Sequence, residues 1–263
     1  MYTRPTEPRS IGGVLDDAIR LYKAAARGWW LPSLLTGLVN AGVALFIGLT
    51  LGLTPQNPAA YLGLLRSPVV VGGYFLIMLA SVYLYCVIIG NLNTVFLGGE
   101  PRATAGFADA LKVLPAAVLA TIGSVLAIMG GAILLIIPGI WLFGRLQLWP
   151  VALMAERGGA GGALGRSWRL VKGHWWRTAT IATIVLLMLI VLMFAVGLVM
   201  AAVIAVWRKD MNTTIVVSQA FSTVMKVVLA PAMPAAAVAM YYDLRLRKEG
   251  DDLTARVGTL QPA

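Results

Sequence analysis

Four long runs of this sequence contain no charged residue, and they limit what the chain can fold into. The runs extend over 28–65, 67–99, 113–144 and 178–207. A bilayer core about 30 Å thick is crossed by roughly 20 apolar residues in a helix, so each run can supply one or two crossings. Only 12% of the residues are charged, whereas charged residues make up about a quarter of a soluble domain. The sequence therefore predicts an all-α, polytopic membrane protein.

Turn residues and polar interruptions divide the four runs into six predicted transmembrane helices. The dipeptide Pro138-Gly139 and the short segment 207–210 are typical tight connections. In the sixth helix, Pro231 and Pro234 predict a bend. The predicted helices extend over about 29–53, 69–97, 114–137, 140–155, 176–206 and 213–242. They would form a single membrane domain over 11–253, between a cytoplasmic arm at 1–10 and a flexible tail at 254–263.

Three amphipathic segments resemble one another. Residues 15–23 and 164–172 share a pattern of apolar and polar positions, and each is closely followed by a pair of tryptophans. Residues 107–113 are a weaker copy. Each copy precedes two predicted spans, so we expect three transmembrane hairpins, each preceded by an amphipathic helix at the cytoplasmic interface. The alternative is that any interfacial helix carries basic residues and aromatic side chains.

The net charge of +10 is distributed in a way that predicts topology. The predicted outer face holds Arg66, Arg208 and Lys209, and two further cations lie inside spans, which leaves sixteen of the 21 Lys and Arg residues on the face of the termini. Because basic residues concentrate on the cytoplasmic side, both termini are expected there. The same clustering at span ends argues against nucleic-acid binding. The polar N-terminus does not resemble a signal peptide.

Four segments carry a resemblance to a known family. They are Ser10-Ile-Gly-Gly-Val-Leu-Asp-Asp-Ala-Ile-Arg-Leu-Tyr22, Pro138-Gly-Ile-Trp-Leu142, Gly165-Arg-Ser-Trp-Arg-Leu-Val-Lys-Gly-His-Trp-Trp176 and Tyr242-Asp-Leu-Arg-Leu-Arg-Lys-Glu-Gly250. In this order the chain resembles the six-span bacterial membrane proteins of the glycerophosphoryl diester phosphodiesterase membrane-domain family. The resemblance implies the bacterial inner membrane and a six-span fold, but no specific activity. We expect no phosphodiesterase domain, because little sequence follows the predicted sixth span.

The sequence offers little for catalysis. His174 is the only histidine and Cys86 the only cysteine, so neither a metal-ligand set nor a disulfide is expected. No nucleophile, zinc or phosphate-loop motif occurs, and every acidic residue falls in a loop or at a span end. We therefore expect a protein that is not an enzyme and that has no cofactor.

Two cations, Arg145 and Lys226, fall inside predicted spans, where a charge is costly and usually faces a cavity or a partner. One hypothesis is that they share a polar cavity and attract an anion such as a lipid phosphate. The alternative is that each reaches the interface or binds backbone carbonyls and only fixes helix packing. Arg166, Arg169 and Lys172 of the third amphipathic segment are further candidates for contact with anionic headgroups.

These features predict a non-catalytic, lipid-interacting or membrane-organising protein whose partners are anionic membrane lipids. The alternative is a small transporter or flippase for an anionic or lipid substrate, which a continuous polar path through the bundle would favour. A third interpretation is an accessory subunit, which an exposed face of small residues would favour. No feature of the sequence predicts a protein partner or an oligomeric state.

Overall fold

The computed structural model of the chain describes residues 2–51, 68–104, 106–207 and 211–260, which form helices and contain no strand. The helices are α1 (Ile11–Ala24), α2 (Ala26–Leu51), α4 (Pro68–Phe96), α5 (Phe107–Leu134), α6 (Ile136–Leu146), α7 (Trp149–Glu156), α8 (Gly159–Val171), α9 (Trp175–Trp207), α10 (Met211–Leu229) and α11 (Ala232–Leu260). Most of the predicted outer connection at 54–68 and the charges Arg66, Arg208 and Lys209 lie outside the described residues.

Five helical segments are long and apolar enough to cross a membrane. They are Pro68–Phe96, Phe107–Leu134, Ile136–Glu156, Trp175–Val206 and Ala220–Gly250. The predicted first span corresponds to α2, whose side chains the structure describes only as far as residue 42. The expectation of an all-helical chain with several apolar, membrane-compatible helices is confirmed.

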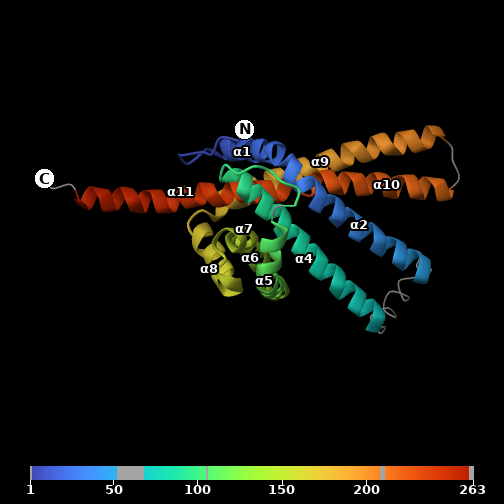
Figure 1. Cartoon of the computed structure of the whole chain (residues 1–263), viewed down its shortest axis with the longest axis horizontal. Helices are drawn as coiled ribbons and strands as arrows, with labels where there is room; N and C mark the ends of the chain where they lie inside the picture. The colour runs from blue at the N-terminus through green and yellow to red at the C-terminus, as the bar shows by residue number, and fades with distance from the viewer. Residues whose placement is uncertain (1, 52–67, 105, 208–210, 261–263) are drawn as a thin grey trace.

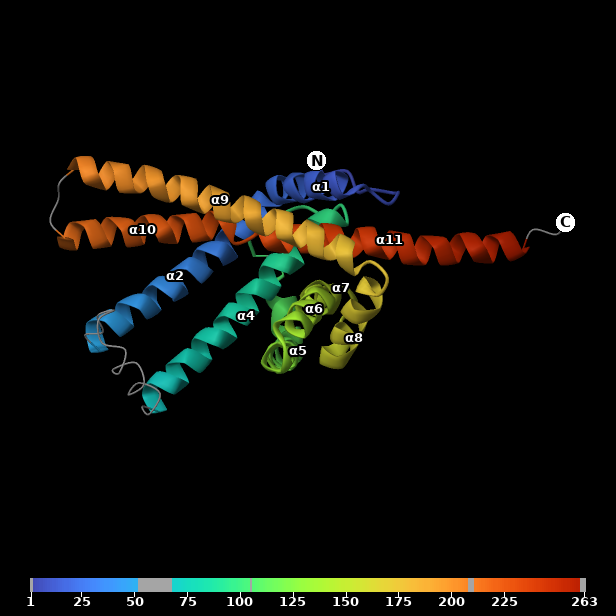
Figure 2. The same cartoon turned by 180° about the vertical axis from the view of Figure 1, so that it is seen from behind.

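The helices form two arms and a central cluster (Figure 1). α9 and α10 form one arm, while α2 and α4 form the other; both arms point to the same side. α11 points to the opposite side, and α5 to α8 lie between (Figure 2). The two arms are therefore the parts of the fold that extend furthest from the α11 side.

The buried core lies where the arms meet, and it is built from α1, the second half of α4, the first half of α5, α7, α8 and the first residues of α9 and α11. In α7, all six residues from Trp149 to Met154 are buried. By contrast, only 6% of the most apolar window of α9 is buried. α7 is thus a core helix, whereas most of α9 presents its side chains to the surroundings.

Several boundaries differ from the predicted ones. The turn expected at Pro138-Gly139 lies at Leu135, whose backbone is extended at φ −163° and ψ 146°. Pro138 falls in the first turn of α6, where its missing N–H costs no hydrogen bond. The weak amphipathic copy at 107–113 is not a separate helix, because it forms the first turns of α5. The backbone of α11 stays helical to Leu260, beyond the predicted boundary at 253.

The fourth and sixth predicted spans are each interrupted at a proline. Residues 147 and 148 separate α6 from α7, because Pro150 lacks an N–H and its ring would clash with the carbonyl of Leu146. The bend predicted at Pro231 is present as a break between α10 and α11.

Candidate functional site

Arg145 lies in the last turn of α6 and packs against two tryptophans. Its Cζ is 4.6 Å from the ring centroid of Trp141 and 4.7 Å from that of Trp168 in α8. Its Nε and Nη1 atoms are buried without a hydrogen-bond partner, and no carboxylate of the described residues pairs with it. The guanidinium charge is therefore stabilised by aromatic rings rather than by an acid.

Ser167 holds Arg145 in this position by bridging the break between α6 and α7. Its hydroxyl donates to the carbonyl oxygen of Arg145 at 2.8 Å and accepts from the backbone N–H of Leu148 at 3.2 Å. The Ser167 residue is fully buried. It thus replaces hydrogen bonds that the helix loses at the break, and it fixes α8 against the last turn of α6.

Trp175, the first residue of α9, packs on the same turn of α6. Its Nε1 donates to the carbonyl oxygen of Trp141 at 3.1 Å. Gly144 makes this approach feasible, because a Cβ added there would lie 2.6 Å from Trp175 Nε1. The start of α9 is therefore fixed beside α6 and Arg145.

Lys248 of α11 adds a positive charge at the C-terminal end of α8. Its Nζ donates to the carbonyl oxygen of Lys172 at 2.8 Å and to that of Arg169. Burial, together with repulsion from the charges of Lys172, Arg145 and Arg166, lowers the pKa of Lys248. We call Arg145, Arg169, Lys172 and Lys248 the basic surface. Because three of its four members were candidates from the sequence, the structure brings most of the predicted cations together.

Arg166, a fourth candidate, has its charge paired inside the protein. Its Nε donates to Glu156 Oε1 at 2.7 Å, and its Nη2 donates to Glu249. The hydroxyl of Tyr241 donates to the same oxygen of Glu156. Arg166 therefore joins α7, α8 and α11, and its guanidinium is less available to a headgroup than the sequence predicted.

Lys226, the remaining candidate, lies in the last turn of α10. Among the described residues, no hydrogen bond, ion pair or ring contact joins it to Arg145. Two cations form no such bond with each other even in a common cavity, so the hypothesis of a shared cavity stays a prediction.

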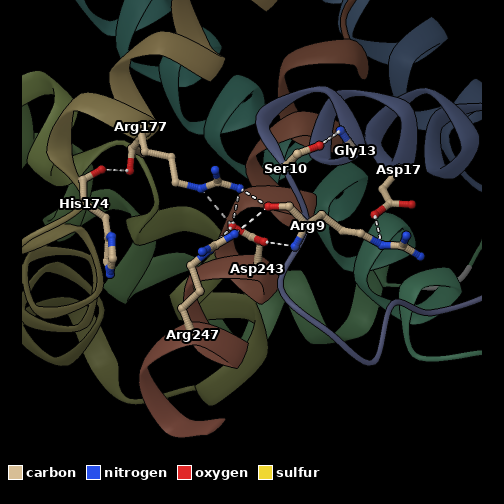
Figure 3. A network of polar contacts seen from close by, with 9 residues as sticks. Arg9, Ser10, Gly13, Asp17, His174, Arg177, Asp243 and Arg247 are labelled. Atoms are coloured by element: carbon tan, nitrogen blue, oxygen red, sulfur yellow. Dashed lines mark hydrogen bonds and ion pairs between the residues drawn. The ribbon is translucent and has the colours of Figure 1, made fainter. Parts of the chain in front are cut away.

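A second polar network centres on Asp243 and was not predicted (Figure 3). Asp243 is 6% exposed and accepts from the Arg9 backbone N–H at 2.8 Å. It also accepts from Arg177 Nη2 at 2.9 Å and from Arg247 Nε at 3.1 Å. Both of these arginines donate to the Arg9 carbonyl oxygen at 2.5 Å. The network thus ties the N-terminal arm to α9 and α11.

Only part of this network has a signal in the sequence. The spacing of Asp243 and Arg247 by four residues indicates a pair on one helix face. No sequence pattern indicates that Arg9 belongs to the network. It contributes only its backbone N–H and carbonyl, and it lies 234 residues before Asp243.

Two titratable groups lie beside this network. Burial, together with the charges of Lys248, Arg247 and Arg177, lowers the pKa of His174. Burial also raises the pKa of Asp17, although Arg9 Nε lies 3.8 Å from its carboxylate and opposes this effect. Among the described residues, no group of three His, Cys, Asp or Glu side chains could hold a metal ion.

A cavity of about 490 Å³ lies away from the basic surface and borders both proline breaks. Trp149, the first residue of α7, and Ala230, between α10 and α11, line it. Its polar lining is formed by Thr36, Asn40, Ser81, Tyr85 and Thr121.

No family model, no curated protein and no solved structure matches the chain. The resemblance to the phosphodiesterase membrane-domain family therefore stays a prediction.

Proposed function

We propose that this protein is a non-catalytic, lipid-interacting component of a bacterial inner membrane and that its basic surface binds the phosphate groups of anionic lipids. The observation that carries the proposal is Arg145, whose guanidinium packs against Trp141 and Trp168 with two unpaired nitrogen atoms. A half-buried cation without a carboxylate is costly, and a phosphate close to the guanidinium can supply the missing negative charge.

The surroundings of Arg145 support the same ligand. The side chains of Arg169 and Lys172 are exposed, and Lys248 adds a further cation. Tryptophan side chains favour the headgroup level of a bilayer, and Trp176 beside this surface is 79% exposed. Each basic residue near an anionic membrane surface contributes about 1 kcal/mol of attraction. With both termini in the cytoplasm, the surface would face the cytoplasmic leaflet.

The test compares Arg145→Met with Lys226→Met. Both variants replace one predicted intramembrane cation by an apolar side chain of similar length, but only Arg145 belongs to the basic surface. The measurement is the amount of phosphatidylglycerol and cardiolipin that co-purifies with the protein, counted by native mass spectrometry. We expect a loss of several-fold for Arg145→Met and no change for Lys226→Met. Equal lipid retention by the wild type and Arg145→Met would contradict the proposal.

A second function, transport of a small polar or lipid substrate, is favoured by one specific observation. The 490 Å³ cavity, which is mainly apolar with a few polar side chains, borders two interrupted helices, and interrupted helices around a substrate site are a feature of transporters. The test is lipid scrambling in proteoliposomes, measured by dithionite bleaching of a labelled phospholipid. Bleaching beyond one half of the label, lost on replacing Asn40 or Thr121 by Leu, would favour transport over the lipid-binding role.

A further inference from the structure

We propose that the α5–α6 hairpin does not cross the bilayer but lies within one leaflet, on the side of the basic surface. The crossing helices would then be α2, α4, α9 and the α10–α11 segment, which keeps both termini on one side. The inference rests on the membrane setting of the proposed function, although not on binding of any particular lipid. Its basis is the placement of α6 relative to the start of α9.

The direction of the hairpin differs from that of the α9–α10 arm. α9 and α10 lie in the plane of Figures 1 and 2, whereas α5 and α6 are seen nearly end-on. α5 has 28 residues and α9 has 33, so their difference in apparent length reflects orientation. A membrane crossed by α9 and α10 would therefore contain α5 and α6 at a steep angle to its normal.

The length of α6 limits how deep the tip of the hairpin can lie, whatever the orientation of the hairpin. The hydrogen bond from Trp175 to Trp141 fixes α6 beside the first residue of α9. The turn at Leu135 is six residues before Trp141, which is about 9 Å at the helical rise of 1.5 Å per residue. The tip of the hairpin therefore lies about 9 Å along α6 from the residue that the Trp175 indole contacts. That is under a third of a hydrocarbon core about 30 Å thick.

α7 cannot extend α6 into a lipid-facing span. α6 and α7 are separate helices with a short interruption at residues 147 and 148, and Trp149 to Met154 are buried in the protein core. Within 136–156, the exposed large apolar side chains all belong to α6, which has eleven residues and buries Gly139, Gly144 and Leu146. An apolar stretch of this length is typical of a re-entrant or interfacial segment rather than of a crossing.

The exposed surface of the hairpin is suited to acyl chains. Residues 133–137 at its tip are 68–81% exposed and all aliphatic. One face of α5 packs into the core, and the other continues the aliphatic surface. Those outward residues are Leu119, Ile122, Val125, Leu126 and Met129. This surface adjoins Trp141 and Arg145, as expected where acyl chains meet headgroups. The occupant is therefore the hydrocarbon of one leaflet.

The test measures the depth of the tip in liposomes. Leu135→Cys and Ile190→Cys, each in a Cys86→Ala background, are spin-labelled, and their accessibility to oxygen and to a nickel complex is compared. Leu135 is exposed, so its replacement leaves the fold intact, and Ile190 lies in the exposed part of α9 as a deep reference. We expect the label at 135 to favour oxygen over nickel and to be shallower than the label at 190. A nickel preference at 135, or a depth equal to or greater than that at 190, would overturn the proposal.

Labelling of intact cells by a membrane-impermeant maleimide provides a second readout. Asp210→Cys, in the predicted outer connection, is the positive control. We expect Leu135→Cys to stay unlabelled, whereas a hairpin that crosses the bilayer would be labelled as strongly as Asp210→Cys. Lipid retention by Arg145→Met is measured independently, so a failure of the hairpin proposal and a failure of headgroup binding are distinguishable.

Discussion

The hydroxyl of Ser167 lies 2.8 Å from the carbonyl oxygen of Arg145, across an interruption between two helices. The same oxygen of Ser167 accepts the N–H of Leu148, so one buried side chain satisfies both sides of the interruption. The backbone of Arg145 is thereby fixed, and its side chain is directed between Trp141 and Trp168. The position of the Arg145 charge in the basic surface thus depends on Ser167, a neutral residue of α8.

Replacing Ser167 by Ala is expected to destabilise the protein by about 1 to 3 kcal/mol. The Leu148 N–H and the Arg145 carbonyl would lose their partner, and an unsatisfied buried group costs about this much. The measurement is thermal unfolding in detergent at neutral pH. Ser124→Ala is the matched control, because the buried Ser124 hydroxyl donates only to a carbonyl of its own helix at 2.9 Å. A shift for Ser167→Ala no larger than that of the control would contradict the bridging role.

Asp243→Asn should destabilise the protein by about 3 kcal/mol, because it leaves Arg177 and Arg247 without their negative partner in a largely buried network. The Arg9 backbone would also be held less firmly, so trypsin should cleave after Arg9 faster than in the wild type. Asp16→Asn is the control, since the Asp16–Arg20 pair is exposed and should contribute less than about 1 kcal/mol. Unchanged trypsin cleavage in Asp243→Asn would show that the network does not retain the arm.

His174 is expected to make stability dependent on pH on the acid side. Burial and the neighbouring charges of Lys248, Arg247 and Arg177 lower its pKa in the folded state, so the unfolded chain binds a proton at a higher pH. The folded state is therefore fully favoured above the unfolded pKa of about 6.5, and stability is lost as the pH falls toward the folded value. His174→Asn should remove this contribution. Melting temperatures between pH 7.5 and 5 provide the measurement, and parallel curves for the two proteins would contradict the assignment.

The sequence predicts the helical class and the approximate positions of most apolar helices, because the uncharged runs reflect the hydrocarbon requirement directly. It does not separate a span from a core helix, since 149–154 in α7 and 190–195 in α9 are both apolar, although only the first segment is buried. That difference arises from tertiary packing around Pro150. For the same reason, the residue type of Arg145 does not reveal its surroundings, and only the fold shows that Lys248 of α11 lies near enough to interact with its charge.

The pairing of Arg166 illustrates a further limit of the sequence. Its two carboxylate partners are ten and 83 residues away, so no local spacing distinguishes it from the exposed Arg169. The face of an amphipathic helix can be predicted from its period, whereas the identity of the neighbour on that face depends on long-range packing.

Gly144 should be required for the basic surface, although it carries no side chain. A methyl group at this position would lie 2.6 Å from Trp175 Nε1, so Gly144→Ala must displace the indole and break its hydrogen bond to the Trp141 carbonyl. Because Trp141 is one of the two rings against Arg145, we expect Gly144→Ala to lower both the melting temperature and the retention of anionic lipid. The control is Gly161→Ala in α8, where an added Cβ meets no atom within 4 Å. Alanine loses less backbone entropy than glycine in a helix, so Gly161→Ala should be stabilised by about 0.5 to 1 kcal/mol. Wild-type lipid retention by a Gly144→Ala protein with a lowered melting temperature would show that the position of Trp175 matters for stability but not for headgroup binding.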